Sequence, residues 1–339
     1  MILSLLACTQ PIELPDDLGA AGVPVGVRTV EHDGLVLEIW YPTTDDRTDV
    51  EDADILQFIP DEIEDIVGGV SLPTLTSGER DAPVRNAGPY PVVLFSHGLG
   101  GYRLQSLDLT VHWASRGYVV IAADHPGRRM QDILPCMFSP ALDGCAVDTD
   151  DPGPHQIKKV LNWVDKDTEF DLDPTRIAMT GHSAGAATTA SIGEDEDFAL
   201  LMPMASARTV ERDTPTLLIS GDCDAYAPEV DLLAAEEDLL MIHDAGHLAF
   251  ADFCELELGG FADSLTGRED INETFLGLLY DLATDGCPGY TPQSTDCEVY
   301  FDLAESKEII RYATTAALDA HMMDQGPGVE DLWDETTLY

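Results

Sequence analysis

The feature that most restricts the fold is a series of short, almost uninterrupted apolar runs that begins near residue 91. Examples are PVVLFSHG (91–98), YVVIAADHPG (118–127), FALLMPMAS (198–206) and TPTLLISGD (214–222). Apolar runs of this length without polar alternation are typical of strands buried on both faces of a parallel sheet. Stretches with helical spacing separate several of them, including 104–117 and 155–167. This alternation predicts an α/β protein with a mainly parallel central sheet and helices on both faces.

The chain is long enough for one large domain, with 339 residues of which 44% are hydrophobic. We find no internal repeat and no second domain, so we expect a single domain over 26–339. Residues 9–25 are rich in Pro, Gly and Ala and are interpreted as a tether. An amphipathic insert at about 51–85 contains ILQFIPDEIEDIVGGV, which Pro60 divides into two short helical pieces. The insert either caps a pocket or packs on the core.

The chain is strongly acidic, because 64 acidic and 17 basic side chains give a formal net charge of −47. A surface of this kind repels nucleic acid and anionic membranes, so we expect neither as a partner. Two interpretations remain for the charge itself. It keeps the protein soluble by self-repulsion, as in a salty habitat, or it attracts a cationic substrate.

The chain begins with MILSLLACTQ. The run from Leu5 to Cys8 resembles the lipobox of bacterial lipoproteins, in which the signal peptide is cut before a cysteine that becomes lipidated. The resemblance implies a signal remnant at 1–8 and a lipid anchor on Cys8. The protein is then expected to be exported, either as an outer-membrane or cell-surface lipoprotein or, with an ordinary export signal, as a secreted protein. No stretch reaches the roughly 20 apolar residues of a membrane span.

Six further cysteines, an even number, fit an oxidising compartment. The short loop CMFSPALDGC predicts a disulfide between Cys136 and Cys145. One completion pairs Cys223 with Cys254 and Cys287 with Cys297, and a Cys254–Cys287 disulfide is the rival. Free buried thiols are a further alternative. The spacing contains no metal-binding C-x-x-C pattern, so we expect no metal.

The stretch TGHSAG (180–185) follows the apolar run RIAMT and precedes a run of small residues. It fits a nucleophile elbow, a sharp turn between strand and helix that exposes the Ser183 hydroxyl. Gly181 and Gly185 suit such a turn, because a side chain at either position would collide with neighbouring backbone. His182 lies in this motif and His97 in the stretch SHGLGG (96–101), and both are interpreted as structural residues.

A serine hydroxyl needs a base to take its proton, and the base needs a carboxylate to hold it. Among the histidines after the elbow, His247 lies just past an apolar run, whereas His243 is placed inside a strand and His321 on the closing helix. The stretch LLISGDCDAYAP offers Asp222 and Asp224 as the acid. We favour Asp224, with Asp222 as a turn-capping residue.

The expected order of nucleophile, acid and base is therefore Ser183, Asp224 and His247, which is the order of α/β-hydrolases. An oxyanion hole needs two backbone N–H groups that face the developing charge. The residue after the nucleophile, Ala184, is one expected donor. The other is Leu99 in SHGLGG (96–101), a loop whose glycines allow a close approach to the substrate.

These motifs identify the chain as similar to the α/β-hydrolase superfamily, and more narrowly to bacterial relatives of platelet-activating-factor acetylhydrolase and dienelactone hydrolase. The resemblance lies in GVRTVEHDGLVLEIWYP, in SHGLGG with RGYVVIAADHPG, in GHSAG, and in LLISGDCDAYAP with AGHLAFADFCEL. It implies hydrolysis of carboxylic esters without a metal or a cofactor. The serine nucleophile differs from the cysteine of true dienelactone hydrolases. Cutinase-like polyester hydrolases share the order of the triad.

The predicted activity is thus a serine carboxylic-ester hydrolase that works through an acyl-enzyme on small or lipid esters. Short-acyl and phospholipid-like esters rank first, and cutin-like polyesters second. Arg128 and Arg129 follow a strand end and either hold an anionic group of the substrate or form ion pairs. An alternative of another class is a surface lipoprotein that keeps the fold as a non-catalytic scaffold.

Overall fold

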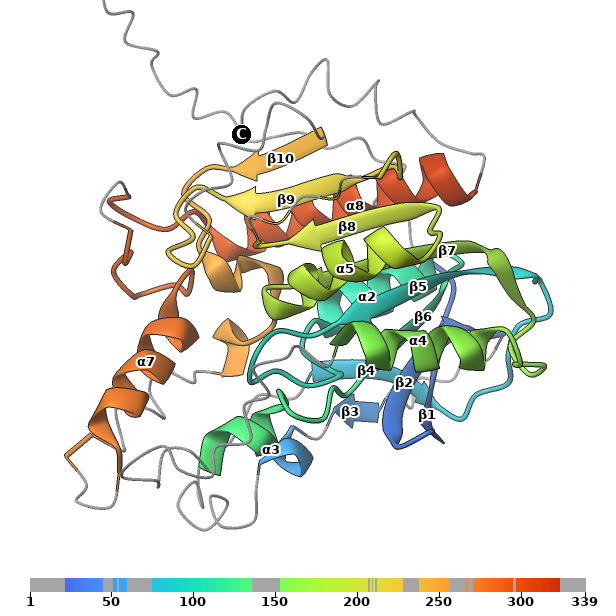
Figure 1. Ribbon diagram of the computed structural model, residues 1–339, viewed down its shortest axis with the longest axis horizontal. Helices are drawn as coiled ribbons and strands as arrows, with labels where there is room; N and C mark the ends of the chain where they lie inside the picture. The colour runs from blue at the N-terminus through green and yellow to red at the C-terminus, as the bar shows by residue number, and fades with distance from the viewer. Residues whose placement is uncertain are drawn as a thin grey trace, which may run out of the picture.

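The computed structural model describes residues 22–44, 51–53, 55–59, 75–135, 153–206, 208, 210, 212–227, 238–256, 266–267, 271–294 and 297–323. Their centre is a ten-stranded sheet with the order β10-β9-β8-β7-β5-β6-β2-β1-β4-β3 (Figure 1). Six strands form its parallel part: β5 (Tyr90–Ser96), β6 (Val119–Ala123), β7 (Leu172–His182), β8 (Leu200–Met204), β9 (Leu217–Gly221) and β10 (Asp238–Ile242). The predicted mainly parallel sheet is confirmed.

The amino-terminal strands extend the sheet past β6. β1 (Val25–His32) and β2 (Leu35–Pro42) form an antiparallel hairpin whose turn has positive φ at Asp33 (47°) and Gly34 (80°). β2 pairs antiparallel with β6, and β1 pairs parallel with β4 (Leu75–Arg80), which carries the short β3 (Glu51–Ala53) at the edge. β3 and β4 belong to the predicted insert at 51–85, so its described ends join the sheet.

The middle of that insert is described only in part. Leu56–Phe58 form one turn of 3-10 helix, η1, and the Phe58 ring is buried and stacks on Tyr102 with 4.5 Å between ring centroids. This contact packs the turn on the core beside the loop that follows β5. Residues 60–74 lie outside the described part of the chain, so a pocket-capping role for the insert stays a prediction.

Helices cover both faces of the sheet. α2 (Leu107–Ser115) and α8 (Leu303–Met322) pack on one face, and α4 (Gly153–Val164) and α5 (Ala184–Asp195) on the other (Figure 1). The shorter or peripheral elements are α3 (Met130–Ile133), α7 (Glu273–Thr284), η4 (His247–Phe250) and η5 (Cys254–Leu256). Among the described residues, no helix is both long and apolar enough to cross a bilayer.

The core follows the alternation of side chains along the buried strands. On β5, Val93 and Phe95 point to the face covered by α2 and α8, whereas Val92 and Leu94 point to the face covered by α4 and α5. All four are fully buried. Fully burying a side chain of this size contributes about 1.5–3 kcal/mol, so both helical layers are held firmly to the sheet.

Strand register brings the carboxyl ends of neighbouring strands to one edge of the sheet. Ser96, the last residue of β5, pairs with Ala123 of β6 and with Gly181 of β7. His182 of β7 pairs in turn with Met204 of β8. The loops that leave these ends hold the residues selected from the sequence, as expected for an open parallel sheet.

Two disulfides are described, and their pairing corrects part of the prediction. Cys254 bonds to Cys287 with 5.2 Å between Cα atoms, which confirms the rival pairing. Cys223 bonds to Cys297 with a Cα–Cα distance of 5.8 Å, so the predicted Cys223–Cys254 and Cys287–Cys297 pairs are wrong. The reason is spatial: the segment that follows α7 folds back over the ends of β9 and β10, and sequence separation does not reveal this return.

Other predictions fall outside the described residues. They concern the Cys136–Cys145 disulfide, the lipobox cysteine Cys8, and all but the last residues of the expected tether at 9–25.

Candidate active site

Ser183 lies at the turn between β7 and α5 in an uncommon backbone conformation. Its φ is 58° and its ψ is −116°, a region that L-residues rarely adopt, and its N–H donates to the Met204 carbonyl at 2.9 Å. A sharp turn of this kind lifts the serine side chain away from both the strand and the helix. The local geometry is therefore that of the predicted nucleophile elbow.

The two elbow glycines are needed because the turn packs against the end of β5. A Cβ atom on Gly185 would lie 1.8 Å from the Ser96 carbonyl oxygen, and one on Gly181 would lie 2.6 Å from the same atom. Real Cβ atoms do not approach backbone this closely. Any side chain at either position would displace the elbow from the sheet edge.

His247 and Asp224 form a buried pair. The Nδ1 atom of His247 lies 2.9 Å from both carboxylate oxygens of Asp224, and each residue is 2% exposed. The Asp224 carboxylate also accepts the N–H groups of Tyr226 (2.8 Å) and Ala227 (3.0 Å). These two main-chain donors fix the orientation of the carboxylate, which still has an acceptor for the Nδ1–H group of the imidazole.

The other acid and base candidates lie elsewhere. His243 lies one residue past the end of β10, so its expected place inside the strand is wrong. It pairs through Nδ1 with Asp222 at 2.5 Å, and both side chains are partly exposed. Asp222 also accepts the N–H of Asp244 at 2.6 Å, which is the turn-capping role expected for it. His321 lies near the end of α8.

The loop after β5 approaches the elbow. A Cβ on Gly98 would lie 3.4 Å from the Cβ of Ser183, so this loop and the elbow are in contact. The N–H groups on both sides of Leu99 are engaged, that of Gly98 with the Gln105 side chain and that of Gly100 with the Arg128 carbonyl. Among the residues that the structure describes, none accepts a hydrogen bond from the Leu99 N–H.

Ala184 is the first residue of α5, where a helical N–H has no partner inside the helix. Within the described part of the chain its N–H likewise meets no acceptor. The predicted oxyanion donors, Leu99 and Ala184, are thus main-chain groups on two loops that touch, and both amides are available to a ligand.

Gln105 and His182 connect these loops through a chain of hydrogen bonds. Gln105 Oε1 accepts the Gly98 N–H at 2.9 Å, and its amide donates to His182 Nδ1 at 2.9 Å. His182 Nε2 then donates to the main-chain oxygen of His247 at 2.8 Å, and the two imidazole rings lie 4.7 Å apart. The residue before Ser183 is therefore bonded to the residue expected to be the base.

Both structural histidines are held neutral. Burial lowers the pKa of His182 to about 3, assisted by the nearby His247. Burial, together with the charge of Arg128, lowers the pKa of His97 to about 3. His97 donates from Nδ1 to the Gly98 carbonyl and accepts the His125 N–H on Nε2. These residues do more than pack, since each fixes a loop of the site through a neutral imidazole.

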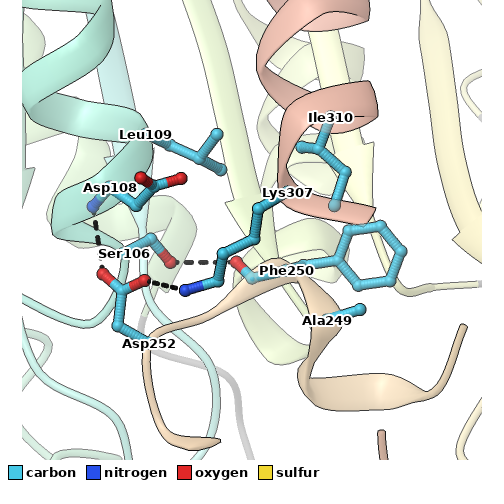
Figure 2. A pocket seen from close by; sticks show the side chains of 8 residues that line it. All are labelled: Ser106, Asp108, Leu109, Ala249, Phe250, Asp252, Lys307 and Ile310. Carbon is cyan, nitrogen blue, oxygen red and sulfur yellow. Dashed lines mark hydrogen bonds and ion pairs between the residues drawn. The ribbon is translucent and has the colours of Figure 1, made fainter. Parts of the chain in front are cut away.

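A second polar cluster supports the loop after His247. Asp252 accepts the Asp108 N–H at 3.0 Å and binds Lys307 of α8 at 2.6 Å, and Ser106 Oγ donates to the Phe250 carbonyl at 3.1 Å (Figure 2). Figure 2 shows these side chains around a small pocket between α2, η4 and α8. The loop is thereby tied to both helices on one face of the sheet.

The two arginines that follow β6 differ in role. Arg129 forms an ion pair with Asp132 at 2.8 Å. Arg128 is 3% exposed. It donates to Ser96 Oγ at 2.5 Å, at the end of β5, and to Thr188 Oγ1 at 2.7 Å, on α5. The ion pair expected for these residues is thus present for Arg129, while Arg128 joins β5 to α5.

One group of potential metal ligands occurs among the described residues, formed by Asp222, Cys223, Asp244 and Cys297. Its two sulfur atoms belong to a disulfide, which leaves two partly exposed carboxylates. A disulfide sulfur is not the thiolate that binds metals, so we assign no metal to this group.

Sequence comparison finds similarity over part of the chain. The model of the family described as platelet-activating factor acetylhydrolase, isoform II, matches residues 25–131, a stretch that contains the Leu99 loop and ends before Ser183. Over 257 residues the chain is 24% identical to the platelet-activating factor acetylhydrolase of Canis lupus familiaris, which covers 58% of this chain and 56% of that protein. Over 271 residues it is 23% identical to the Cavia porcellus protein of the same name, with 63% and 61% covered. The chain thus spans less than two thirds of these relatives.

Structure comparison agrees on the fold. A ferulic acid esterase from Streptomyces cinnamoneus superimposes with a TM-score of 0.59 and 20% identity, over 94% of this chain and 95% of that one. At this level of identity, the similarity concerns the arrangement of the sheet and its helices.

Proposed function

We propose that this chain is a serine carboxylic-ester hydrolase of the α/β-hydrolase superfamily and that it acts through an acyl-enzyme. The observation that carries the proposal is the strained backbone at Ser183, φ 58°, together with a buried His247–Asp224 pair whose main chain is hydrogen-bonded to His182, the residue before Ser183. A serine held in such a turn beside an oriented imidazole is the arrangement that acyl transfer requires.

In the acylation step, Ser183 Oγ attacks the ester carbonyl while His247 Nε2 takes the hydroxyl proton. The tetrahedral intermediate carries its negative charge on the former carbonyl oxygen, which accepts the N–H groups of Leu99 and Ala184. Asp224 stabilises the imidazolium through Nδ1–H. The C–O bond of the ester then breaks, and His247 returns the proton to the departing alcohol.

Deacylation reverses the roles. Water donates a proton to His247 Nε2 as its oxygen attacks the acyl carbon, and the bond to Ser183 Oγ breaks as the imidazolium returns that proton to the serine. The products are a carboxylic acid and an enzyme with its original protonation. The chemistry is complete with the residues of the chain and one water molecule.

For the substrate we propose neutral or zwitterionic esters with short acyl groups, including phospholipid-like esters. The names of the curated relatives support an acetyl ester, and the net charge of −47 disfavours anionic lipids. Leu99 and Tyr226 are 44% and 39% exposed, and Tyr226 lies 5.0 Å from the His247 ring, so apolar surface is present beside the proposed catalytic residues. Polyesters rank second.

The acyl preference can be tested with p-nitrophenyl esters of increasing chain length, run beside a short-acyl phospholipid and a polyester film. We expect kcat/KM to be highest for acetyl to butyryl esters, and hydrolysis to depend on Ser183 for every substrate. Preference for long acyl chains, or for the film over the soluble esters, would contradict this substrate assignment while leaving the mechanism intact.

For location we propose an exported protein, since two disulfides fit an oxidising compartment. Lipidation of Cys8 remains the more specific part of this proposal. Mass analysis of the mature protein isolated from membranes tests it, with a diacylglyceryl mass on an amino-terminal cysteine as the expected result.

A further inference from the structure

The residues that follow α7 contact both loops of the proposed acid–base pair. The Asp285 side chain is fully buried, and its Oδ2 atom accepts the main-chain N–H of His247 at 3.2 Å and that of Ala225 at 3.1 Å. The Asp285 carbonyl accepts the Leu248 N–H at 2.8 Å. One residue thus binds the backbone beside Asp224 and the backbone of His247 itself.

The remaining carboxylate oxygen of Asp285 is held by Tyr300. The Tyr300 hydroxyl donates to Oδ1 at 2.5 Å, and the next residue, Phe301, donates its N–H to the Asp244 carbonyl at 2.8 Å. Burial raises the pKa of Asp285, and the Tyr300 hydroxyl and the two main-chain N–H groups oppose this rise. Both oxygens of a buried carboxylate are therefore satisfied by three donors.

The contact between this segment and the base loop is too close to admit a side chain. A Cβ on Gly246 would lie 2.5 Å from the Gly286 nitrogen and 2.8 Å from the Tyr300 ring. The two disulfides close the same region, since Cys223 precedes Asp224 and bonds to Cys297, and Cys254 bonds to Cys287. Residues 285–294 and 297–301 are thus held against the acid loop and the base loop.

We propose that Asp285, oriented by Tyr300, is a positioning residue that keeps the His247 imidazole and the Asp224 carboxylate at hydrogen-bonding distance from each other. This inference rests on the proposed function. Asp285 touches no reacting atom. It binds the main-chain N–H groups of His247 and of Ala225, next to Asp224, and in this proposal its negative charge favours the imidazolium that forms during acylation.

Titratable groups from three parts of the chain contact His247. They are Asp224 and Tyr226 from the loop after β9, His182 from β7, and Asp285 from the segment after α7. His182 is neutral and Tyr226 has a pKa raised to about 12, mainly by burial. Asp224 and Asp285 are therefore the two carboxyl groups that bind His247, the first at Nδ1 and the second at the main-chain N–H.

The test uses Asp285→Asn and Tyr300→Phe in the full chain. Asn keeps an oxygen that accepts the two N–H groups and removes the charge, and its NH2 can donate to the Tyr300 oxygen in place of the bond that this hydroxyl donates in wild type. We expect kcat to fall about 10- to 100-fold with KM within about threefold, and the acid limb of the kcat/KM profile to move down by about half a pH unit or more. Tyr300→Phe should change both in the same direction by less.

A matched control comes from another tyrosine–aspartate pair, in which the hydroxyl of Tyr118, just before β6, donates to Asp319 of α8 at 2.8 Å. Asp319→Asn and Tyr118→Phe remove the same chemistry away from the site and should leave the pH profile unchanged. Thermal unfolding identifies any variant that fails to fold. If Asp285→Asn is one of them, Tyr300→Phe decides the question. A profile for Tyr300→Phe or folded Asp285→Asn that matches the controls overturns the proposal.

A measurement that does not depend on catalysis tests this inference separately from the proposed function. NMR titration of ¹⁵N-labelled histidines follows His247 directly, and in Asp285→Asn its imidazole should take up a proton at lower pH than in wild type. If no ester is hydrolysed yet this shift is present, the proposed function fails and the positioning role stands. If Ser183-dependent hydrolysis is present and the shift is absent, only the inference fails.

Discussion

The Nδ1 atom of His247 lies 2.9 Å from both carboxylate oxygens of Asp224, inside a region where each residue is 2% exposed. An imidazole that donates from Nδ1 keeps Nε2 as an acceptor, which is the tautomer a general base needs. The arrangement also distinguishes Asp224 from Asp222, two residues earlier, whose carboxylate binds His243 at the surface.

That distinction predicts different results for two similar substitutions. Asp224→Asn should lower kcat about 10³- to 10⁴-fold, because the Asn oxygen stays with the Tyr226 and Ala227 N–H groups and its NH2 donates to Nδ1, which favours the wrong tautomer. Asp222→Asn removes an exposed pair and should stay within about twofold of wild type. Steady-state kinetics on one soluble ester measures both. Equal losses in the two variants would mean that the acid has been misassigned.

The elbow predicts a contrast between two glycines on helices. Gly185→Ala places a Cβ 1.8 Å from the Ser96 oxygen, so the turn must shift by an ångström or more, and kcat should fall at least about 100-fold. Gly277→Ala on α7 meets no atom within 4 Å and should leave activity intact while changing the unfolding free energy by up to about +1 kcal/mol. Full activity in Gly185→Ala would show that the close contact is not required.

The chain of hydrogen bonds through Gln105 predicts that this side chain matters to activity as well as stability. Gln105→Met leaves the Gly98 N–H and His182 Nδ1 without partners, at about 1–3 kcal/mol each. We expect a lower urea midpoint and a lower kcat, because the Leu99 loop loses its anchor.

Gln156 provides the matched control for that experiment. It also joins a buried histidine, His125 at 2.7 Å, to a main-chain carbonyl, that of Pro126 at 3.0 Å. Gln156→Met should reduce stability by a similar amount with a much smaller effect on kcat. If the two variants lose activity equally, the Gln105 network has no special relation to the site.

The buried neutral histidines predict acid sensitivity of the fold. His97 and His182 have pKa values lowered to about 3, whereas the pKa of a histidine in the unfolded chain is about 6.5. Below that value the unfolded chain binds protons that the folded chain excludes. The unfolding free energy should therefore fall as pH decreases through 6.5, by at most about 1.4 kcal/mol per pH unit for each histidine.

Urea unfolding between pH 7.5 and 5.5 measures this slope. Buried carboxylates with raised pKa values, such as Asp124 and Asp252, act in the opposite direction, so the slope of wild type alone is not decisive. The comparison with His97→Asn isolates one histidine. Its slope should be shallower than that of wild type, and identical slopes would contradict a neutral buried imidazole at position 97.

Much of the architecture was predictable because short apolar runs and glycine-bounded turns carry local physical meaning. The strands from β5 onward lie where continuous apolar residues predicted them. Ser183 follows the expected strand in a sharp turn with positive φ, and Asp224 rather than Asp222 meets His247. The amino-terminal β4 was not predicted, since LTSGER has neither apolar alternation nor a buried run.

The remaining features depend on contacts between distant segments. The disulfide partners could not be assigned because the return of 285–301 over β9 and β10 has no local signature. Asp285 escaped notice for the same reason, as it follows α7 in a polar stretch with no motif. Gln105 looked like one polar residue of a helix, and only the fold places it between Gly98 and His182.

The central claim, that Ser183 is a nucleophile activated by His247, is tested most directly by a fluorophosphonate probe and intact-mass measurement. The account predicts one covalent adduct on wild type, located at Ser183 by peptide mapping, and none on Ser183→Ala. Folded wild-type protein that takes up no label, or that is labelled equally after the substitution, would contradict it.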